Sequence, residues 1–343
     1  VNNVLMGYQA GDSITTSNNN VAIGTTALAT TSTSAGNNTA IGHAAMLDNT
    51  TGQNNVAVGL NALQNNTSAS NNVAMGYESL NLNQTGTNNV AVGYRALANC
   101  NSNNNTAIGL NAGDAITSSV SNTLIGHNAG SAISTGAGEN VVIGNNAGPL
   151  MTTGAQNIII GDNAVGNGVL TGGTNVVIGD NAAYSLATAT NSIAIGSLTM
   201  YHATGGAHNI AVGDAALQDL TTGQYNVSMG HRAAGDNTTG QFQIAIGHAA
   251  LNSNLTGSEN TVVGAQARYY ATSGSGNVAV GRAVMLNGSG GENNVGVGKD
   301  ALYNAGARSA NTAVGHNSGS AITSGDNNTI LGRFNGNQGG LDI

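Results

Sequence analysis

Histidines that recur at one point of a repeated motif are the first residues in this sequence that suggest chemistry. Five of the seven directly follow a motif glycine: His43, His127, His231, His248 and His316. Imidazoles at matching positions could hold a metal ion, above all if several copies of the chain brought them together. The sequence has no Cys/His cluster with the spacing of a zinc site. We therefore expect surface or structural roles for these histidines, with no metal and no cofactor.

Three carboxylates, Asp162, Asp180 and Asp214, occupy the same point of the motif as the histidines. Paired carboxylates are the catalytic groups of glycosidases. Catalysis also needs a concave site that excludes water, and a chain of regular repeats supplies none. We therefore expect no enzymatic activity.

The elements that position these side chains are set by a tandem repeat. The motif Asn-x-Ala-Ile-Gly recurs in twenty units spaced by 16 to 18 residues. With the motif glycine as position 0, position −1 is apolar, position −2 is usually Ala, and position −3 is Val, Ile or Thr. Position −4 is Asn in eighteen units. Such a period indicates a repeat architecture rather than globular domains.

The alternation around each glycine predicts one short β-strand per unit. About seventeen residues are too few for a strand and a crossover helix, so the simplest all-β fold is a parallel β-solenoid of about twenty coils. We expect one continuous array over residues 1–335. Residues 336–343 form a Gly/Asn-rich segment that we expect to lead into a different C-terminal region.

Two columns of the repeat have direct structural readings. Asn side chains stacked at one position of successive coils can hydrogen-bond as a ladder. We expect such a ladder at position −4, beginning with Asn3, Asn20, Asn38, Asn55, Asn72, Asn89 and Asn105. Glycine at position 0 indicates a positive φ or a close backbone approach, as at Gly24, Gly42, Gly59, Gly76 and Gly93.

Position −2 bears on how copies of the chain associate. If positions −3 and −1 fill the interior of the coil, position −2 points outward and forms an apolar stripe that should not face water. We therefore expect this stripe to be the seam of a homotrimer. Its proposed residues are Ala22, Ala40, Ala57, Leu124, Val142, Ile159 and Val177.

Composition limits the classes of partner. The chain carries 7 Lys and Arg against 15 Asp and Glu, for a net charge of −8. Nucleic acids and anionic membranes select clustered cations, so neither is an expected partner. No apolar run reaches the roughly 18 residues of a membrane span. Among the tyrosines, the adjacent Tyr269 and Tyr270 are the strongest candidates for contact with a host receptor such as a glycan.

The units resemble two known kinds of repeat. Asn38-Thr39-Ala40-Ile41-Gly42 and its equivalents are similar to the head repeats of trimeric autotransporter adhesins. They resemble still more closely the Asn/Gly-rich repeat regions of bacteriophage tail-fibre and virion fibre proteins. The resemblance implies a left-handed parallel β-roll and a homotrimer.

We therefore expect a structural segment of a phage tail or virion fibre, extracellular and located on the virion. Its partners would be further copies of itself, other virion fibre proteins, and a host-surface glycan or protein. The head of a trimeric adhesin on a bacterial cell surface is the main alternative. A monomeric solenoid with a flat ligand- or ice-binding face is a third, and it needs an outward Thr array. Here Thr is scattered or lies at position −3, which we expect to point inward.

Overall fold

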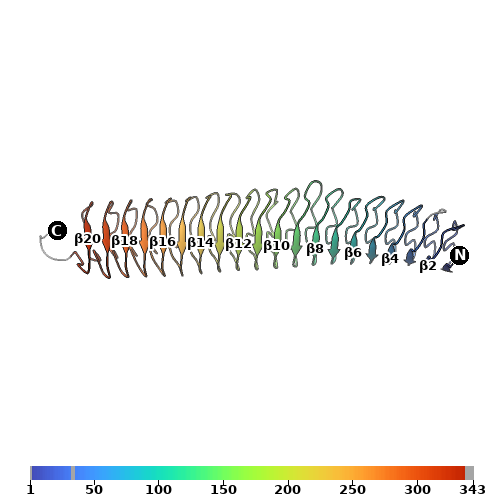
Figure 1. Ribbon diagram of the computed structural model, residues 1–343, viewed down its shortest axis with the longest axis horizontal. Helices are drawn as coiled ribbons and strands as arrows, with labels where there is room; N and C mark the ends of the chain where they lie inside the picture. Colours follow the sequence, from blue (N-terminus) through green and yellow to red (C-terminus); the bar gives the residue numbers. More distant parts are fainter. Residues whose placement is uncertain (1, 32–34, 337–343) are drawn as a thin grey trace. The chain divides into compact units, whose positions relative to one another are not determined.

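The computed structural model describes residues 2–31 and 35–336. The chain divides into two compact units, Val1–Thr174 and Asn175–Ile343. Each unit is a parallel β-solenoid in which every coil contributes one three-residue strand (Figure 1). The predicted segment 336–343 lies, apart from Gly336, outside the described residues.

The first unit holds ten strands among its described residues. They are β1 (Val4–Met6), β2 (Val21–Ile23), β3 (Thr39–Ile41), β4 (Val56–Val58), β5 (Val73–Met75), β6 (Val90–Val92), β7 (Thr106–Ile108), β8 (Thr123–Ile125), β9 (Val141–Ile143) and β10 (Ile158–Ile160).

The described part of the second unit holds ten more. They are β11 (Val176–Ile178), β12 (Ile193–Ile195), β13 (Ile210–Val212), β14 (Val227–Met229), β15 (Ile244–Ile246), β16 (Thr261–Val263), β17 (Val278–Val280), β18 (Val295–Val297), β19 (Thr312–Val314) and β20 (Thr329–Leu331). The predicted fold class, an all-β parallel solenoid with coils of about seventeen residues, is confirmed.

Within each unit, consecutive strands pair in parallel and in the same register. Val56 is opposite Val73, and Val73 is opposite Val90. In the second unit Val278 is opposite Val295 in the same way. Backbone bonds between coils continue beyond the strands, as from the Leu28 amide to the Ala45 carbonyl at 3.0 Å. Stacking of equivalent residues therefore holds around the whole coil.

Each strand is short because the backbone turns at both of its ends. The motif glycines have φ near +135°, as at Gly42, and a β-carbon on Gly93 would lie 2.5 Å from the Gly109 carbonyl oxygen. The predicted bend with close backbone approach is thus present. Left-handed residues follow at positions +2 and +4, where Arg95 and Leu97 have φ of 54° and 51°. These turns return the chain to the start of the next coil.

The coil interior is lined by position −2, which corrects the sequence interpretation. In β2 through β19 the middle residue of the strand is buried, whereas the flanking residues at −3 and −1 are partly or largely exposed. The expected trimer-seam residues are therefore core residues with 0% or 1% exposure: Ala22, Ala40, Ala57, Leu124, Val142, Ile159 and Val177. They cannot form a seam between chains.

The physical reason for the inversion is the narrowness of the coil. A loop of about seventeen residues encloses room for Ala at −2 and for Asn at −4, both of which are fully buried in coils such as that of Ala57 and Asn55. Close packing leaves no space inside for two further β-branched side chains per strand. Those larger side chains consequently face outward.

Further interior positions are +3, +4 and +7. They hold, for example, Ala96, Leu97 and Cys100, all fully buried. Cys100 lies in the core, and burial raises the pKa of its thiol. Where position −2 is large, position +4 of the preceding coil is often glycine, as in the pair Leu124 and Gly113.

The expected asparagine ladder is present at position −4. The Asn55 amide N–H donates to Asn38 Oδ1 at 3.0 Å, and the Asn72 amide N–H donates to Asn55 Oδ1 at 2.9 Å. Each Nδ2 also donates to a backbone carbonyl of the following coil, as from Asn55 to Ala69 at 2.9 Å. The same pattern includes Asn3, Asn20, Asn38, Asn72, Asn89 and Asn105. These bonds satisfy amides that would otherwise be costly to bury.

Candidate functional site

The outward side chains at positions −3 and −1 of successive strands form an apolar face on each unit. We call this surface the apolar face. Many of its larger residues are 36–43% exposed, which is unusual for Ile, Met and Val that recur at the same positions of successive coils. In the first unit they include Ile41, Met75, Ile108 and Ile158; in the second they include Ile195, Ile210, Met229, Ile244, Ile246, Val280 and Val314.

The apolar face is built from the same alternation that builds the core. Since neighbouring side chains of a strand point to opposite faces, burying Ala74 at −2 forces Val73 and Met75 outward. Parallel stacking in register then places each such residue beside its equivalent in the next coil. The result is a flat strip of β-branched and thioether side chains with no charged member.

Threonine at position −3 belongs to this face, which corrects a second expectation. Thr39, Thr106, Thr123, Thr261, Thr312 and Thr329 point outward and not into the coil. They make up six of the twenty residues in the column, and the others are Val or Ile. The face is thus predominantly apolar.

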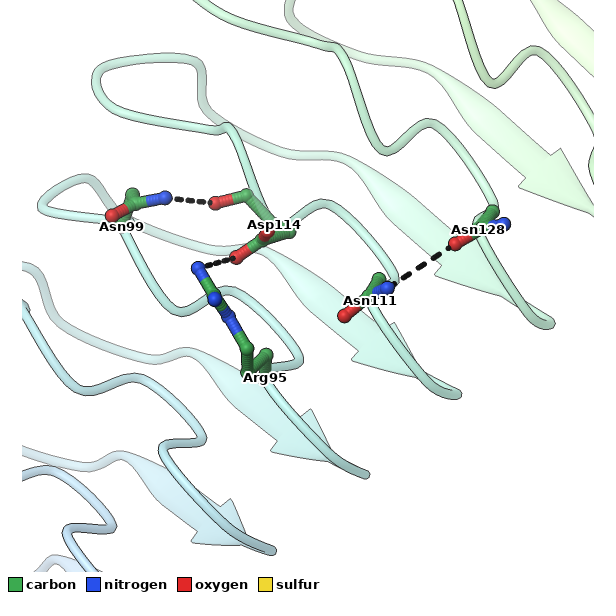
Figure 2. Close-up of polar contacts among 5 residues, drawn as sticks. All are labelled: Arg95, Asn99, Asn111, Asp114 and Asn128. Atoms are coloured by element: carbon green, nitrogen blue, oxygen red, sulfur yellow. Dashed lines mark hydrogen bonds and ion pairs between the residues drawn. The ribbon is translucent and has the colours of Figure 1, made fainter.

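The loop surface, formed by positions +2, +5 and +6, carries polar contacts between coils. In Figure 2 the guanidinium of Arg95 reaches Asp114 in the next coil, with Nη2 and Oδ1 3.4 Å apart. Asn99 Nδ2 donates to the Asp114 carbonyl oxygen at 2.8 Å, and Asn111 Nδ2 donates to Asn128 Oδ1 at 3.4 Å. Partial burial raises the pKa of the Asp114 carboxyl, and the nearby Arg95 opposes that shift. These contacts link adjacent coils.

The histidine column contains one close pair. His231 and His248 stack with ring centroids 5.3 Å apart, as their positions in consecutive units predict. Asp214 Oδ2 lies 3.4 Å from His231 Nε2. Asp162 instead accepts a hydrogen bond from Asn145 Nδ2 at 2.8 Å. Across residues 2–31 and 35–336, no three His, Cys, Asp or Glu side chains are grouped as ligands for a metal ion.

The tyrosine pair lies on the surface of the second unit. Tyr269 and Tyr270 meet edge to face with centroids 4.6 Å apart, and Tyr270 is 55% exposed. Each ring therefore covers an edge or face of the other. Their role in receptor contact stays a prediction.

Sequence reasoning missed two features of the second unit. His208, Tyr225 and Phe242 form a stack over three coils, with centroids 4.9 Å and 5.1 Å apart. A second pair, Tyr184 and Tyr201, stacks at 5.0 Å. Both could have been found by reading the sequence down each position of the repeat, because equivalent positions stack in a solenoid.

No membrane-crossing helix is present in the part of the chain that the structure describes. Comparison with family models, with curated proteins and with solved structures finds no match to this chain.

Proposed function

We propose that this chain is a structural segment of a bacteriophage tail or virion fibre, in which three copies pack through their apolar faces. The observation that carries the proposal is the apolar face itself. A strip of Ile, Val and Met along every coil is costly in water, and burial stabilises by roughly 25 cal/mol per Å² of apolar surface. A second and a third copy of the same chain carry the same strip, so the copies can cover one another's apolar surface.

The symmetry of the repeat favours identical chains as the occupants of this face. The strip recurs with the period of the coil, so a matching partner must carry the same period. Closed rotational symmetry lets each copy bury the same surface. The proposed left-handed winding and the virion location come from the resemblance of units such as Asn38–Gly42 to phage fibre repeats.

The proposed role is mechanical and involves no catalysis. Each coil depends on its neighbours for stability, and chains joined along their length would resist unfolding together. Such a segment would extend or present a receptor-binding region, together with other fibre proteins of the particle. The head of a trimeric bacterial adhesin would use the same face and is the alternative assignment.

The test of assembly is the solution mass of the segment measured by light scattering on a sizing column. We expect about three times the chain mass of 33.7 kDa. The double variant Met75→Glu/Ile108→Glu places charges on two −1 residues that are 43% and 41% exposed, and should reduce the mass to that of one chain.

The matched control is Leu82→Glu/Leu150→Glu, which changes two leucines that are 47% and 41% exposed at position +6. This control should remain trimeric, and circular dichroism should show that both variants keep their strands. A monomeric wild type would contradict the proposed packing of three chains and would favour a solenoid with a free flat face. Antibodies against the segment should label purified virions; labelling of a bacterial envelope would favour the adhesin.

A further inference from the structure

A groove crosses four successive coils of the second unit, from β16 to β19. Its volume is about 520 Å³, within the range of ligand sites in proteins. The lining side chains come from positions +1, +2, +5 and +6 and from neither column of the apolar face. The groove lining is therefore distinct from the apolar face.

Cations follow one edge of this groove. Arg282 and Lys299 line it from position +1 of consecutive coils, and both side chains are exposed. The same column continues with His316 and Arg333, also exposed. Three of the seven Lys and Arg residues thus stand in one column over four coils of a chain whose net charge is −8. The positive charge is local and ordered.

One acid faces these cations. Asp300 lines the groove, and its Oδ2 lies 3.6 Å from Lys299 Nζ. An exposed pair of this kind is weak, typically under about 1 kcal/mol. Within the described residues the Arg282 guanidinium forms no hydrogen bond or ion pair. The edge therefore keeps a net positive charge available to a ligand.

The corresponding loop surface of the first unit shows what opens the groove. There the position +2 residue Arg95 reaches across to Asp114 at position +5 of the next coil (Figure 2). In the second unit, position +2 of the β17 coil is Ala283, whose side chain is too short to reach position +5 of the next coil. The depression between the two columns is consequently left open.

We propose that this groove binds an acidic polysaccharide, with Arg282 and Lys299 contacting successive anionic groups. Carboxamides of Gln266, Asn304 and Asn317 line the groove and can bond sugar hydroxyls, while Tyr303 offers an aromatic surface. Duplex DNA is a poorer fit, because the two cations that line the groove could neutralise only a few of its closely spaced phosphates. The inference deepens the proposed fibre function by naming the class of host receptor.

The experiment measures binding of galacturonic acid oligomers to the full chain by titration calorimetry. The matched probe is the methyl-esterified oligomer, which keeps the sugar backbone and lacks its charge. Oligomers of glycerol phosphate test phosphate as the source of the anion, and a short DNA duplex tests nucleic acid. We expect the galacturonate oligomer to bind more tightly than the glycerol phosphate oligomer, with affinity falling as salt rises.

Variants assign the binding to the groove. Arg282→Gln/Lys299→Gln should weaken binding about tenfold or more, the equivalent of one charge-assisted contact. Asp300→Asn should strengthen it, which a merely structural role would not do. Arg232→Gln/Arg308→Gln changes net charge equally at residues outside the groove lining and should change affinity less than about twofold.

Equal binding of charged and esterified oligomers, or no binding by any probe, would overturn the proposal. Tighter binding of glycerol phosphate or DNA than of galacturonate would also overturn it, as would unchanged binding by the Arg282→Gln/Lys299→Gln variant. Light scattering on the same samples tests the fibre proposal independently of glycan binding. If the chain is a trimer but binds no acidic glycan, only the proposed ligand of the groove is contradicted.

Discussion

Leu124 occupies the space that a side chain at position 113 would need. A β-carbon built on Gly113 lies 2.6 Å from Leu124 Cδ1, across two adjacent coils. In several other coils the relation is reversed, with Leu at +4 and Ala at −2, as for Leu80 and Ala91. Volume is therefore shared between the two positions, and the large −2 residues are accommodated within the core.

The exchange Gly113→Leu together with Leu124→Ala tests this volume sharing. Leu124→Ala alone should cost about 2–5 kcal/mol of unfolding free energy through the cavity it leaves. Gly113→Leu alone should cost more than about 1 kcal/mol through overpacking. The double variant should be more stable than the sum of the two losses predicts, as measured by urea denaturation. Simple additivity would show that the two sites do not compete for space.

The buried ladder should be sensitive to a change of one atom. Asn72→Asp removes the Nδ2 that donates to the Gly86 carbonyl oxygen at 3.0 Å. A carboxylate oxygen then faces that carbonyl oxygen, and neither can donate a hydrogen bond. We expect a loss of about 3–5 kcal/mol, because the charge is buried without a partner. Asn88→Asp makes the same change at an exposed site and should stay within about 0.5 kcal/mol. Thermal unfolding of both variants provides the comparison; similar losses would contradict a special role for the ladder.

Close contact between coils should make the motif glycines irreplaceable. Gly93→Ala places a β-carbon against the Gly109 carbonyl oxygen at φ of 132°, and we expect a loss above about 3 kcal/mol. Gly136 also has a positive φ, 79°, with no atom within 4 Å of the added carbon. Gly136→Ala should therefore cost only about 1 kcal/mol. Equal unfolding midpoints in guanidinium would show that the close approach is relaxed in solution.

Arg268 is a charged side chain in the core. It is 1% exposed at position +4, where neighbouring coils place Leu251 and Met285, and its Nε has no hydrogen-bond partner. Burial lowers the pKa of its guanidinium to about 10, so the fold disfavours the charged form. We expect Arg268→Leu to stabilise the chain by about 1–4 kcal/mol.

The matched control for Arg268→Leu is Arg282→Leu, which changes an exposed arginine and should alter stability by less than about 0.5 kcal/mol. Denaturation at neutral pH measures both. A lower midpoint for Arg268→Leu would show that the bond from Arg268 Nη2 to the Ser273 carbonyl, 3.1 Å long, outweighs the cost of burying the charge.

Periodicity in the sequence predicted each strand, the turn at each glycine and the ladder at −4, because these depend on local chemistry repeated in register. It did not predict which strand face lies inside. Alternation separates Val56 and Val58 from Ala57, but hydrophobicity alone assigns the larger pair to the core. The asparagine column could have identified the interior face. Asn55 lies on the same face of the strand as Ala57, and its hydrogen bonds stabilise the fold most where water is absent.

The candidate surfaces were harder to predict for a related reason. Arg282 and Lys299 are seventeen residues apart in sequence and resemble isolated surface charges. Stacking makes them neighbours, and the groove beside them depends on the small size of Ala283, which follows Arg282 in the same coil. Comparing charged residues at equivalent positions of successive repeats predicts that Arg282 and Lys299 are neighbours. The groove beside them depends on how the loops pack and could not be predicted in this way.

Uniform register also has a genetic consequence. Val56 meets Val73 just as Val73 meets Val90, so each coil offers its successor the surface that its predecessor offered to it. Loss or duplication of one whole repeat in the gene joins two surfaces that already match. Recombination between repeats can thus change the number of coils in fixed steps, and selection can adjust the reach of the protein without inventing a new interface.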